Sequence, residues 1–329
     1  MSLKGKRVLV TGAGGFIGSH LAERLVQEHC EVSAMVRYSS TNHRGWLETS
    51  PLADQMSFVF GDIADPHFVS NAVSGNDIVF HLAALIGIPY SYVAPFAYVR
   101  TNVDGTVNVA KAAQESGVER VLQVSTSEVY GTALRVPIDE EHPKQPQSPY
   151  SASKIAADSL AESYYRSFET PIVIVRPFNT FGPRQSMRAV IPTIIAQCFE
   201  SKTIQLGNMT PTRDMNFVGN TVSGMVQAAL APADKVIGEH INLGSGAEHS
   251  IGEIAQLIAD KMGMAIDVHE EQQRLRPEKS EVFRLVADAQ KAADLIDWRA
   301  EVDLSEGLDR TIEWMAENRH LYRSTGYAI

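Results

Sequence analysis

The residues best suited to chemistry in this chain are Thr126 and Glu128, in the run Ser125–Gly131, together with Tyr150 and Lys154. Tyr150 and Lys154 are four residues apart, so on a helix both side chains project from one face. An ammonium group beside a phenol stabilises the phenolate, which makes Tyr150 a candidate base for a sugar or alcohol hydroxyl. Glu128 is not needed for that step. Its place two residues after Thr126 therefore suggests a second proton transfer, from carbon.

The composition is that of an ordinary soluble protein. The chain has 329 residues, 44% of them apolar and 21% charged, enough for a large core and two lobes. A formal net charge of -10 argues against general nucleic-acid or membrane-surface binding. Cys30 and Cys198 lack metal-ligand spacing, so neither a disulfide nor a metal site is expected. With no signal peptide and no apolar run of membrane-spanning length, we expect a cytoplasmic protein.

Short β-branched runs alternate with amphipathic stretches through the first half of the chain. The runs predict strands at Arg7–Thr11, Glu31–Arg37, Phe58–Phe60, Ile78–Leu82, Arg120–Ser125 and Ile172–Arg176. The amphipathic stretches predict helices at Ile17–Glu28, Pro66–Ser74, Tyr98–Ser116 and Tyr150–Phe168. This βαβ alternation is typical of a Rossmann-like, doubly wound parallel sheet in the α/β class. We assign residues 1–176 and about 216–248 to that dinucleotide-binding domain. Residues 177–215 and 249–329 are expected to form a smaller α/β substrate lobe.

A glycine-rich loop follows the first predicted strand and opens a helix. Its glycines stand at Gly12, Gly15 and Gly18, with Phe16 and Ile17 between the last two. Glycines at this spacing allow a tight turn and close approach of backbone N–H groups to a pyrophosphate, which the helix N-terminus attracts. The loop predicts a nicotinamide dinucleotide, NAD or NADP; a turn with a purely structural purpose is the alternative.

Residues at or after the ends of the second, third and fourth predicted strands indicate how the cofactor is bound. Arg37 stands where NAD-binding chains usually carry an acidic residue, so a 2′-phosphate contact favours NADP over NAD; Arg37 stacked on adenine or exposed to solvent is the alternative. Asp62 can reach the adenine amino group. His81 is expected to be packed and hydrogen-bonded rather than catalytic. Further cofactor contacts are assigned to Ile63, Leu82, Ala83 and Ala84.

With the glycine loop, Thr126, Tyr150 and Lys154 together, the chain resembles the extended short-chain dehydrogenase/reductase superfamily, whose members act on nucleotide sugars. The resemblance implies that Thr126 hydrogen-bonds the sugar 4-hydroxyl and that Tyr150 accepts its proton. It also implies that Lys154 lowers the pKa of Tyr150 and holds the nicotinamide ribose.

Within that superfamily, Thr126-Ser127-Glu128 is similar to the sugar-nucleotide 4,6-dehydratases. Hydride loss from C4 gives a 4-keto sugar, whose carbonyl acidifies the C5 proton. Glu128 is suited to take that proton while the C6 hydroxyl leaves as water, with Ser127 assisting where some relatives have an aspartate. The hydride then returns to C6. A solvated loop carboxylate, or a partner for a nearby arginine, is the alternative for Glu128.

The closer resemblance is to the N-acetylglucosamine-nucleotide 4,6-dehydratases of legionaminic-acid-type bacterial pathways, which implies a UDP- or GDP-linked N-acetylglucosamine. It rests on His81–Tyr92, Ser148–Asp158, Arg176–Ile195, Thr210–Val218 and Glu271–Val282. Alternatives are a GDP-mannose-type 4,6-dehydratase, a UDP-hexosamine 4-epimerase, a 5,6-dehydratase and a non-enzymatic NADP-binding sensor.

The nucleoside diphosphate should be held by the smaller lobe. Asn179 matches the superfamily asparagine at the diphosphate, and Arg213 and Arg276 suit bidentate phosphate contacts. The remaining candidate substrate contacts are Ile86, Tyr90, Arg184, Arg188 and Val190. The superfamily pairs through the helices Tyr98–Ser116 and Tyr150–Phe168, so a homodimer is expected.

Overall fold

The structure, a computed structural model that describes residues 2–322, is built on a seven-stranded parallel sheet. The strand order is β11-β6-β5-β4-β1-β2-β3. The chain thus winds outward from β1 in both directions, which is the doubly wound, Rossmann-like arrangement that the sequence predicts. The strands are β1 (Arg7–Thr11), β2 (Glu31–Arg37), β3 (Met56–Gly61), β4 (Ile78–His81), β5 (Arg120–Val124), β6 (Ile172–Pro177) and β11 (His240–Leu243).

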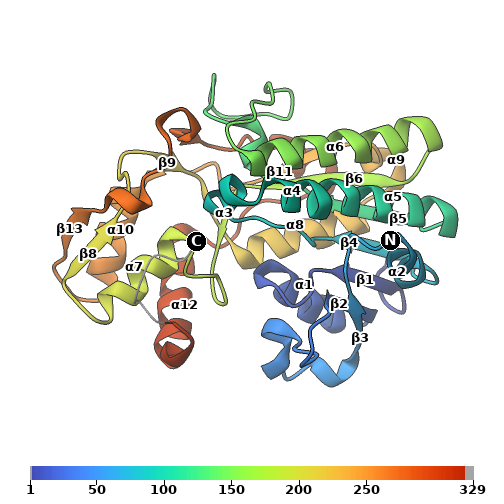
Figure 1. Cartoon of the computed structure of the whole chain (residues 1–329), viewed down its shortest axis with the longest axis horizontal. Helices are drawn as coiled ribbons and strands as arrows, with labels where there is room; N and C mark the ends of the chain where they lie inside the picture. Colours follow the sequence, from blue (N-terminus) through green and yellow to red (C-terminus); the bar gives the residue numbers. More distant parts are fainter. Residues whose placement is uncertain (1, 323–329) are drawn as a thin grey trace.

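Helices cover both faces of this sheet (Figure 1), which is why the central strands are apolar along their whole length. The core on one face joins strand side chains to helices α1 and α8, and the core on the other joins them to α2, α5 and α6. The bounds are α1 (Phe16–Gln27), α2 (Pro66–Val73), α5 (Gly105–Ser116), α6 (Pro149–Phe168), α8 (Val218–Leu230) and α11 (Gln290–Ile296).

The helix expected over 98–116 is interrupted. Short helices α3 (Ile88–Val93) and α4 (Pro95–Tyr98) lead into a π-helical turn, Val99–Asp104, before α5 begins. The side chain of Asn102, within this turn, bonds the loop after β4. Its amide oxygen accepts the Leu85 N–H at 2.8 Å, and its amide nitrogen donates to the Leu85 carbonyl at 2.9 Å. Single π-helical turns inside helices are rare and frequently lie at functional sites. Here the turn fixes the loop after β4.

The smaller lobe lies beside the carboxyl ends of the strands (Figure 1). Its short strands form the pairs β10–β7 and β13–β8 and the three-stranded set β12-β9-β14. Its strands are β7 (Asn179–Phe181), β8 (Thr203–Leu206), β9 (Thr212–Arg213), β10 (Met215–Phe217), β12 (His249–Ser250), β13 (Asp267–Glu270) and β14 (Arg284–Leu285). Its helices are α7 (Val190–Cys198), α10 (Ile251–Lys261) and α12 (Leu304–Glu317), and α9 (Ala233–Val236) precedes β11.

The chain crosses between the two parts more than once. After β10 it enters α8 and then β11, which pairs in parallel with β6 as the last strand of the large sheet. Asp214, fully buried between β9 and β10, accepts hydrogen bonds from the backbone of Ser245, Gly246 and Ala287 at 2.8, 2.9 and 3.1 Å. One carboxylate therefore ties the end of β11 to the smaller lobe and holds Arg213 beside it.

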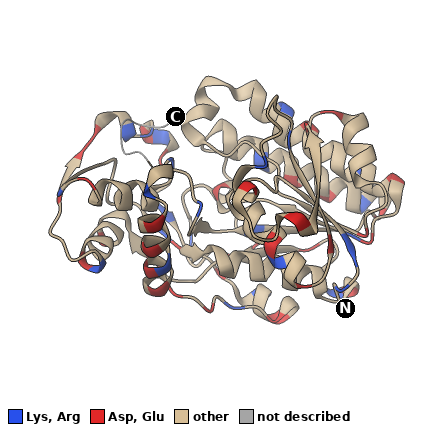
Figure 2. Cartoon of the chain, turned by 90° about the horizontal axis from the view of Figure 1, so that it is seen from below, with Lys and Arg blue, Asp and Glu red and all other residues tan. Residues whose placement is uncertain are grey.

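Residues of both charges are interspersed along the ribbon in Figure 2. No helix within residues 2–322 is long and apolar enough to cross a bilayer.

Candidate functional site

A cavity of about 960 Å³ lies at the carboxyl ends of the parallel strands, between the sheet and the smaller lobe. This is where open α/β sheets bind their ligands. Most of the residues singled out from the sequence line it: Gly12, Gly15, Phe16, Ile17, Gly18, Arg37, Leu82, Ala83, Ala84, Ile86, Thr126, Ser127, Glu128, Tyr150, Lys154, Asn179, Arg188, Val190, Arg213 and Arg276.

Helix α6 places Tyr150 and Lys154 in the cavity wall. Ser148 and Ser151 form a capping box at the start of the helix, and Pro149 occupies its first turn, a strong signal for where a helix begins. Tyr150 therefore sits at the helix N-terminus, 7% exposed, and Lys154 one turn later, 4% exposed.

Burial sets the protonation of this pair. It raises the pKa of Tyr150; a hydrogen bond with Thr126 lowers that pKa, and the negative charge of Glu128 raises it further. The ammonium of Lys154 donates to the Val124 carbonyl at 2.7 Å. The lowering of the Tyr150 pKa by Lys154, which the sequence resemblance implies, stays a prediction.

Thr126 and Glu128 stand at the end of β5, on a single 3₁₀ turn, Ser127–Tyr130. The Thr126 hydroxyl caps this turn by accepting the Glu128 N–H at 3.2 Å. Glu128 is 8% exposed, and Ser127 is 2% exposed, so neither is a solvated loop residue. The nearest cation to Glu128 is Arg276, with Nη1 4.0 Å from the carboxylate.

The glycine loop forms a cradle that no side chain can fill. Gly12 has a φ of +72°, and a Cβ there would lie 2.9 Å from the Ala83 nitrogen. A Cβ on Gly18 would lie 2.2 Å from the Gly12 carbonyl oxygen. Helix α1 begins directly after Gly15, with its N-terminal N–H groups at the cavity. The loop fits a pyrophosphate.

Two predicted cofactor contacts lie outside this cavity. Asp62 is exposed, and its carboxylate accepts the Ala64 N–H at 2.9 Å. Ile63 is buried in the core that includes α2 and α5. Arg37, by contrast, ends β2 at the cavity rim, where its side chain is exposed.

The opposite wall is cationic. Arg213 is 6% exposed and lies 3.6 Å from Glu281. Burial lowers the pKa of Arg213, while the negative charge of Glu128 raises it. Three buried polar atoms along the cavity have no hydrogen-bond partner within residues 2–322: Asn179 Oδ1, Gln185 Oε1 and Arg276 Nη1. Buried polar atoms are rarely left unsatisfied. Arg276 Nη1 can donate to an anionic group, and the two amide oxygens can accept from a hydroxyl or N–H group of a ligand.

Two predicted substrate contacts, Arg184 and Tyr90, do not line this cavity. Arg184 donates to both oxygens of Glu23 at 3.0 Å and to Ser19 at 3.2 Å; it joins the smaller lobe to α1 rather than facing the cavity. Tyr90 packs near Tyr98, with ring centroids 6.1 Å apart, and does not line the cavity.

Sequence patterns did not indicate several residues that shape or line the cavity. Asn102 also donates to Ser153 on α6 at 2.9 Å, so it holds the β4 loop against the catalytic helix. Gln185 and Glu281 line the cavity as well. Both fall in or beside stretches that carry the sequence resemblance, which was the available signal.

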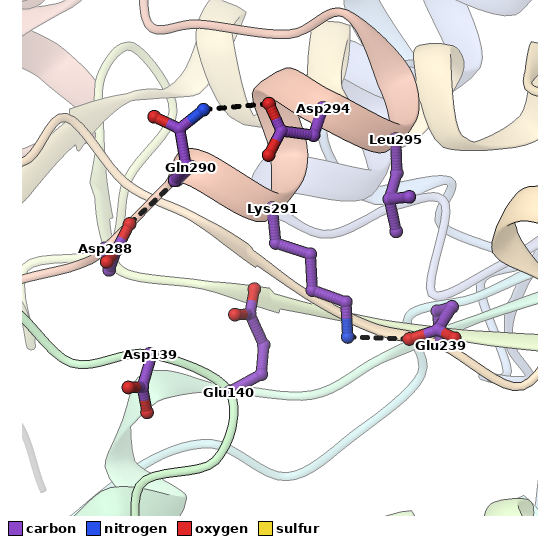
Figure 3. A pocket seen from close by; sticks show the side chains of 8 residues that line it. All are labelled: Asp139, Glu140, Glu239, Asp288, Gln290, Lys291, Asp294 and Leu295. Atoms are coloured by element: carbon purple, nitrogen blue, oxygen red, sulfur yellow. Dashed lines mark hydrogen bonds and ion pairs between the residues drawn. The ribbon is translucent and has the colours of Figure 1, made fainter.

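A second hollow, of about 370 Å³, shares no lining residue with the first. Figure 3 shows its carboxylates around Lys291, which pairs with Glu239 at 2.6 Å. No group of three or more possible metal ligands is found among residues 2–322. This hollow therefore adds nothing to the chemistry at Tyr150. Its lining residues are Asp139, Glu140, Glu239, Asp288, Gln290, Lys291, Asp294 and Leu295.

Known proteins resemble this chain in both architecture and sequence. The profile of the family described as GDP-mannose 4,6 dehydratase matches residues 9–311. The chain belongs to that family. The match places the chain within the extended short-chain dehydrogenase/reductase superfamily, as its motifs predict. The narrower resemblance to N-acetylglucosamine-nucleotide dehydratases stays a prediction.

The similar proteins are named either as 4,6-dehydratases or as epimerases. A dTDP-D-glucose 4,6-dehydratase from Homo sapiens is 34% identical over 336 residues, 98% of this chain and 94% of the relative. The solved structure of an epimerase from Methanothermobacter thermautotrophicus has a TM-score of 0.87 and 31% identity, covering 97% of this chain and 94% of that one. A dTDP-glucose 4,6-dehydratase from Streptomyces venezuelae, solved with NAD bound, has a TM-score of 0.85 and 28% identity, covering 96% and 98%.

His81, beneath the site, is held neutral. The Thr11 hydroxyl accepts the N–H groups of Leu82 and Ala83 at 3.1 Å, so it donates its own proton to His81 Nδ1, 2.8 Å away. Burial, together with the charge of Lys154, lowers the pKa of His81 to about 3. His81 is thus a packed, hydrogen-bonded residue, as the sequence predicts.

This histidine makes stability depend on pH. Between its ordinary pKa of 6.5 and its folded value of about 3, the unfolded chain binds a proton that the folded chain does not, so stability falls as pH drops through that window. We expect His81→Gln to reduce the slope of unfolding free energy against pH by up to about 1.4 kcal/mol per unit. Urea unfolding at a series of pH values measures it. His67→Gln, at an exposed position, is the control, and an unchanged slope in His81→Gln would contradict the assignment.

Proposed function

We propose that the protein is a nucleotide-sugar 4,6-dehydratase that converts UDP- or GDP-linked N-acetylglucosamine to the 4-keto-6-deoxy sugar. One observation carries the proposal: Glu128 is buried in the same cavity wall as Thr126 and Tyr150. Its charge is close enough to raise the pKa of Tyr150. An acid at that place is redundant for oxidation at C4 and is needed for removal of the C5 proton.

The residues divide the work between two proton transfers. Thr126 orients the 4-hydroxyl, and Tyr150 takes its proton. Glu128 then removes the proton from C5, next to the new carbonyl, while Ser127 assists departure of the C6 hydroxyl as water. Bound NAD or NADP supplies the chemistry of accepting hydride from C4 and returning it to C6.

The smaller lobe is the proposed nucleotide-binding part. Arg213 and Arg276 face the cavity from the side opposite the glycine cradle, and guanidinium groups suit the two phosphates of a nucleoside diphosphate. Asn179 adds an unsatisfied amide oxygen there, which can accept from a hydroxyl or N–H group of the nucleotide sugar. The sugar would then extend from these arginines toward Tyr150, past Ile86, Arg188 and Val190.

A homodimer is part of the proposal. Val93, Phe96 and Val99 are 72%, 86% and 48% exposed, on the segment that leads into α5, beside α6. Exposed apolar side chains gathered in this way favour burial against a partner. A second copy pairing through α5 and α6, as the superfamily resemblance implies, would cover them.

The reaction itself is tested by product mass. Incubation with UDP- and GDP-linked N-acetylglucosamine should give a product lighter by one water molecule, with deuterium from heavy water incorporated at C5. A product of unchanged mass and inverted C4 would replace the dehydratase proposal with a 4-epimerase, the activity suggested by the epimerase relative. Nucleotide-linked glucose and mannose, tested in parallel, define the sugar.

Two variants separate the proton transfers. We expect Tyr150→Phe to abolish turnover while cofactor binding survives, because only the phenol oxygen is lost. Glu128→Gln, equal in size, should still oxidise C4 but lose water at least about 100-fold more slowly, in the range that a positioned acid or base contributes. Single-turnover absorbance of the reduced cofactor follows the first step, and product mass follows the second. Normal water loss by Glu128→Gln would rule out its role as the base.

The cofactor preference is tested at Arg37. We propose that its guanidinium meets the 2′-phosphate of NADP, because it lines the cavity at the end of β2. Arg37→Gln should weaken NADP binding about tenfold or more, the cost of one charge-assisted hydrogen bond, and leave NAD binding nearly unchanged. Calorimetry with both cofactors decides it. An equal loss for the two, or a wild-type preference for NAD, would contradict this contact.

A further inference from the structure

Helix α6 carries a third polar residue in line with the catalytic pair. Asp158 follows Lys154 by four residues, as Lys154 follows Tyr150, so all three lie along one helix face. Asp158 is fully buried. None of the mechanistic roles above uses it.

Asp158 holds the end of β5 through a single oxygen. Its Oδ2 accepts from Ser125 Oγ at 2.8 Å and from Arg176 Nε and Nη2 at 3.3 and 3.2 Å. Its Oδ1 has no hydrogen-bond partner within residues 2–322. Arginine–carboxylate pairs are frequently bidentate, with the guanidinium fork on both oxygens. Here one oxygen is left uncommitted, in a place without solvent.

Arg176, on β6, is shared with other groups. It donates to the Tyr130 hydroxyl at 2.9 Å and contacts His240 Nδ1. Tyr130 in turn donates to Asn242 at 2.8 Å, and the Asn242 N–H is bound by Glu140 at 2.7 Å. The half-buried Lys144 also feels the charge of Asp158. Asp158 is therefore the fully buried anion in a region rich in cations.

Lys154 is a second buried cation, on the same helix face as Asp158. It is 4% exposed, its ammonium donates to the Val124 carbonyl, and it makes no ion pair within the described part of the chain. Facing it are neutral His81 on β4 and Tyr150 on its own helix. Burial lowers the pKa of Lys154, and the negative charge of Asp158 raises it.

We propose that Asp158 is a positioning residue that keeps Lys154 charged beneath the reacting hydroxyl and ties Ser125, next to Thr126, to the catalytic helix. One buried carboxylate thereby serves two buried cations. The role rests on the proposed function only at oxidation of C4, the step that a dehydratase and an epimerase share.

Direct titration of Lys154 tests this. In protein grown with isotopically labelled lysine, the side-chain NMR signal of Lys154, assigned by its loss in Lys154→Met, reports its charge without any turnover. In the wild type Lys154 should stay charged through neutral pH. In Asp158→Asn its midpoint should fall by about one pH unit or more, the usual effect of removing a neighbouring opposite charge.

Two further variants separate charge from structure. Ser125→Ala removes a hydrogen bond to Asp158 but no charge, so it should leave the Lys154 midpoint unchanged. Asp158→Asn with Arg176→Gln removes the buried ion pair as a unit, which avoids stranding Arg176 if the single variant fails to fold. It should lower the midpoint by less than Asp158→Asn alone, because the loss of the Arg176 charge offsets part of the effect. The fall should be matched by a shift of the alkaline limb of C4 oxidation to lower pH.

The titration midpoint of Lys154 either supports or overturns the proposed role of Asp158. A wild-type Lys154 that is neutral at neutral pH, or a midpoint that is unchanged in whichever Asp158 variants fold, would overturn the proposal. Because the titration needs no substrate, a failure of water loss in the product assay would refute the dehydratase function and leave this inference standing.

Discussion

The buried ion pair between Asp158 and Arg176 is the interaction on which the geometry of the site depends. It joins α6 to β6, and through Ser125 it also holds the end of β5. Both side chains are fully buried, so loss of either partner alone would strand a charge without solvent. Thr126 lies beyond Ser125, and Tyr150 and Lys154 lie on α6. The pair therefore sets how the strand end faces the catalytic helix.

Glu128 lies in a cavity whose two sides differ in character. The sheet side carries the glycine cradle and the Tyr150 helix, and the smaller lobe brings Arg213 and Arg276. Glu128 stands where they meet, buried near Tyr150 on one side and 4.0 Å from Arg276 on the other. This placement follows from the connections between the lobes, above all the buried Asp214 and the bond from Arg184 to Glu23.

Much of the fold could be predicted from the sequence because its signals are local. Continuous apolar runs marked the central strands, and Ser148-Pro149 marked the start of α6 within one residue. The interruption at 99–104 could not be predicted, because the periodicity there still reads as helix. At this turn Asn102 bonds Leu85, seventeen positions earlier, a contact that no local pattern shows. Arg184 was likewise assigned to substrate because an arginine carries no local sign of whether its partner is a ligand or a carboxylate such as Glu23.

The sequence by itself determined the glycine loop, the spacing of Tyr150 and Lys154, and the acid at 128, because each depends on neighbours within one strand, turn or helix. Only the tertiary structure decided which charges face one another. It paired Asp158 with Arg176, placed Arg276 beside Glu128 and left Lys154 buried without an ion-pair partner within residues 2–322. Electrostatic energies depend on distance and on exclusion of water, and both are set by packing between segments remote in the chain.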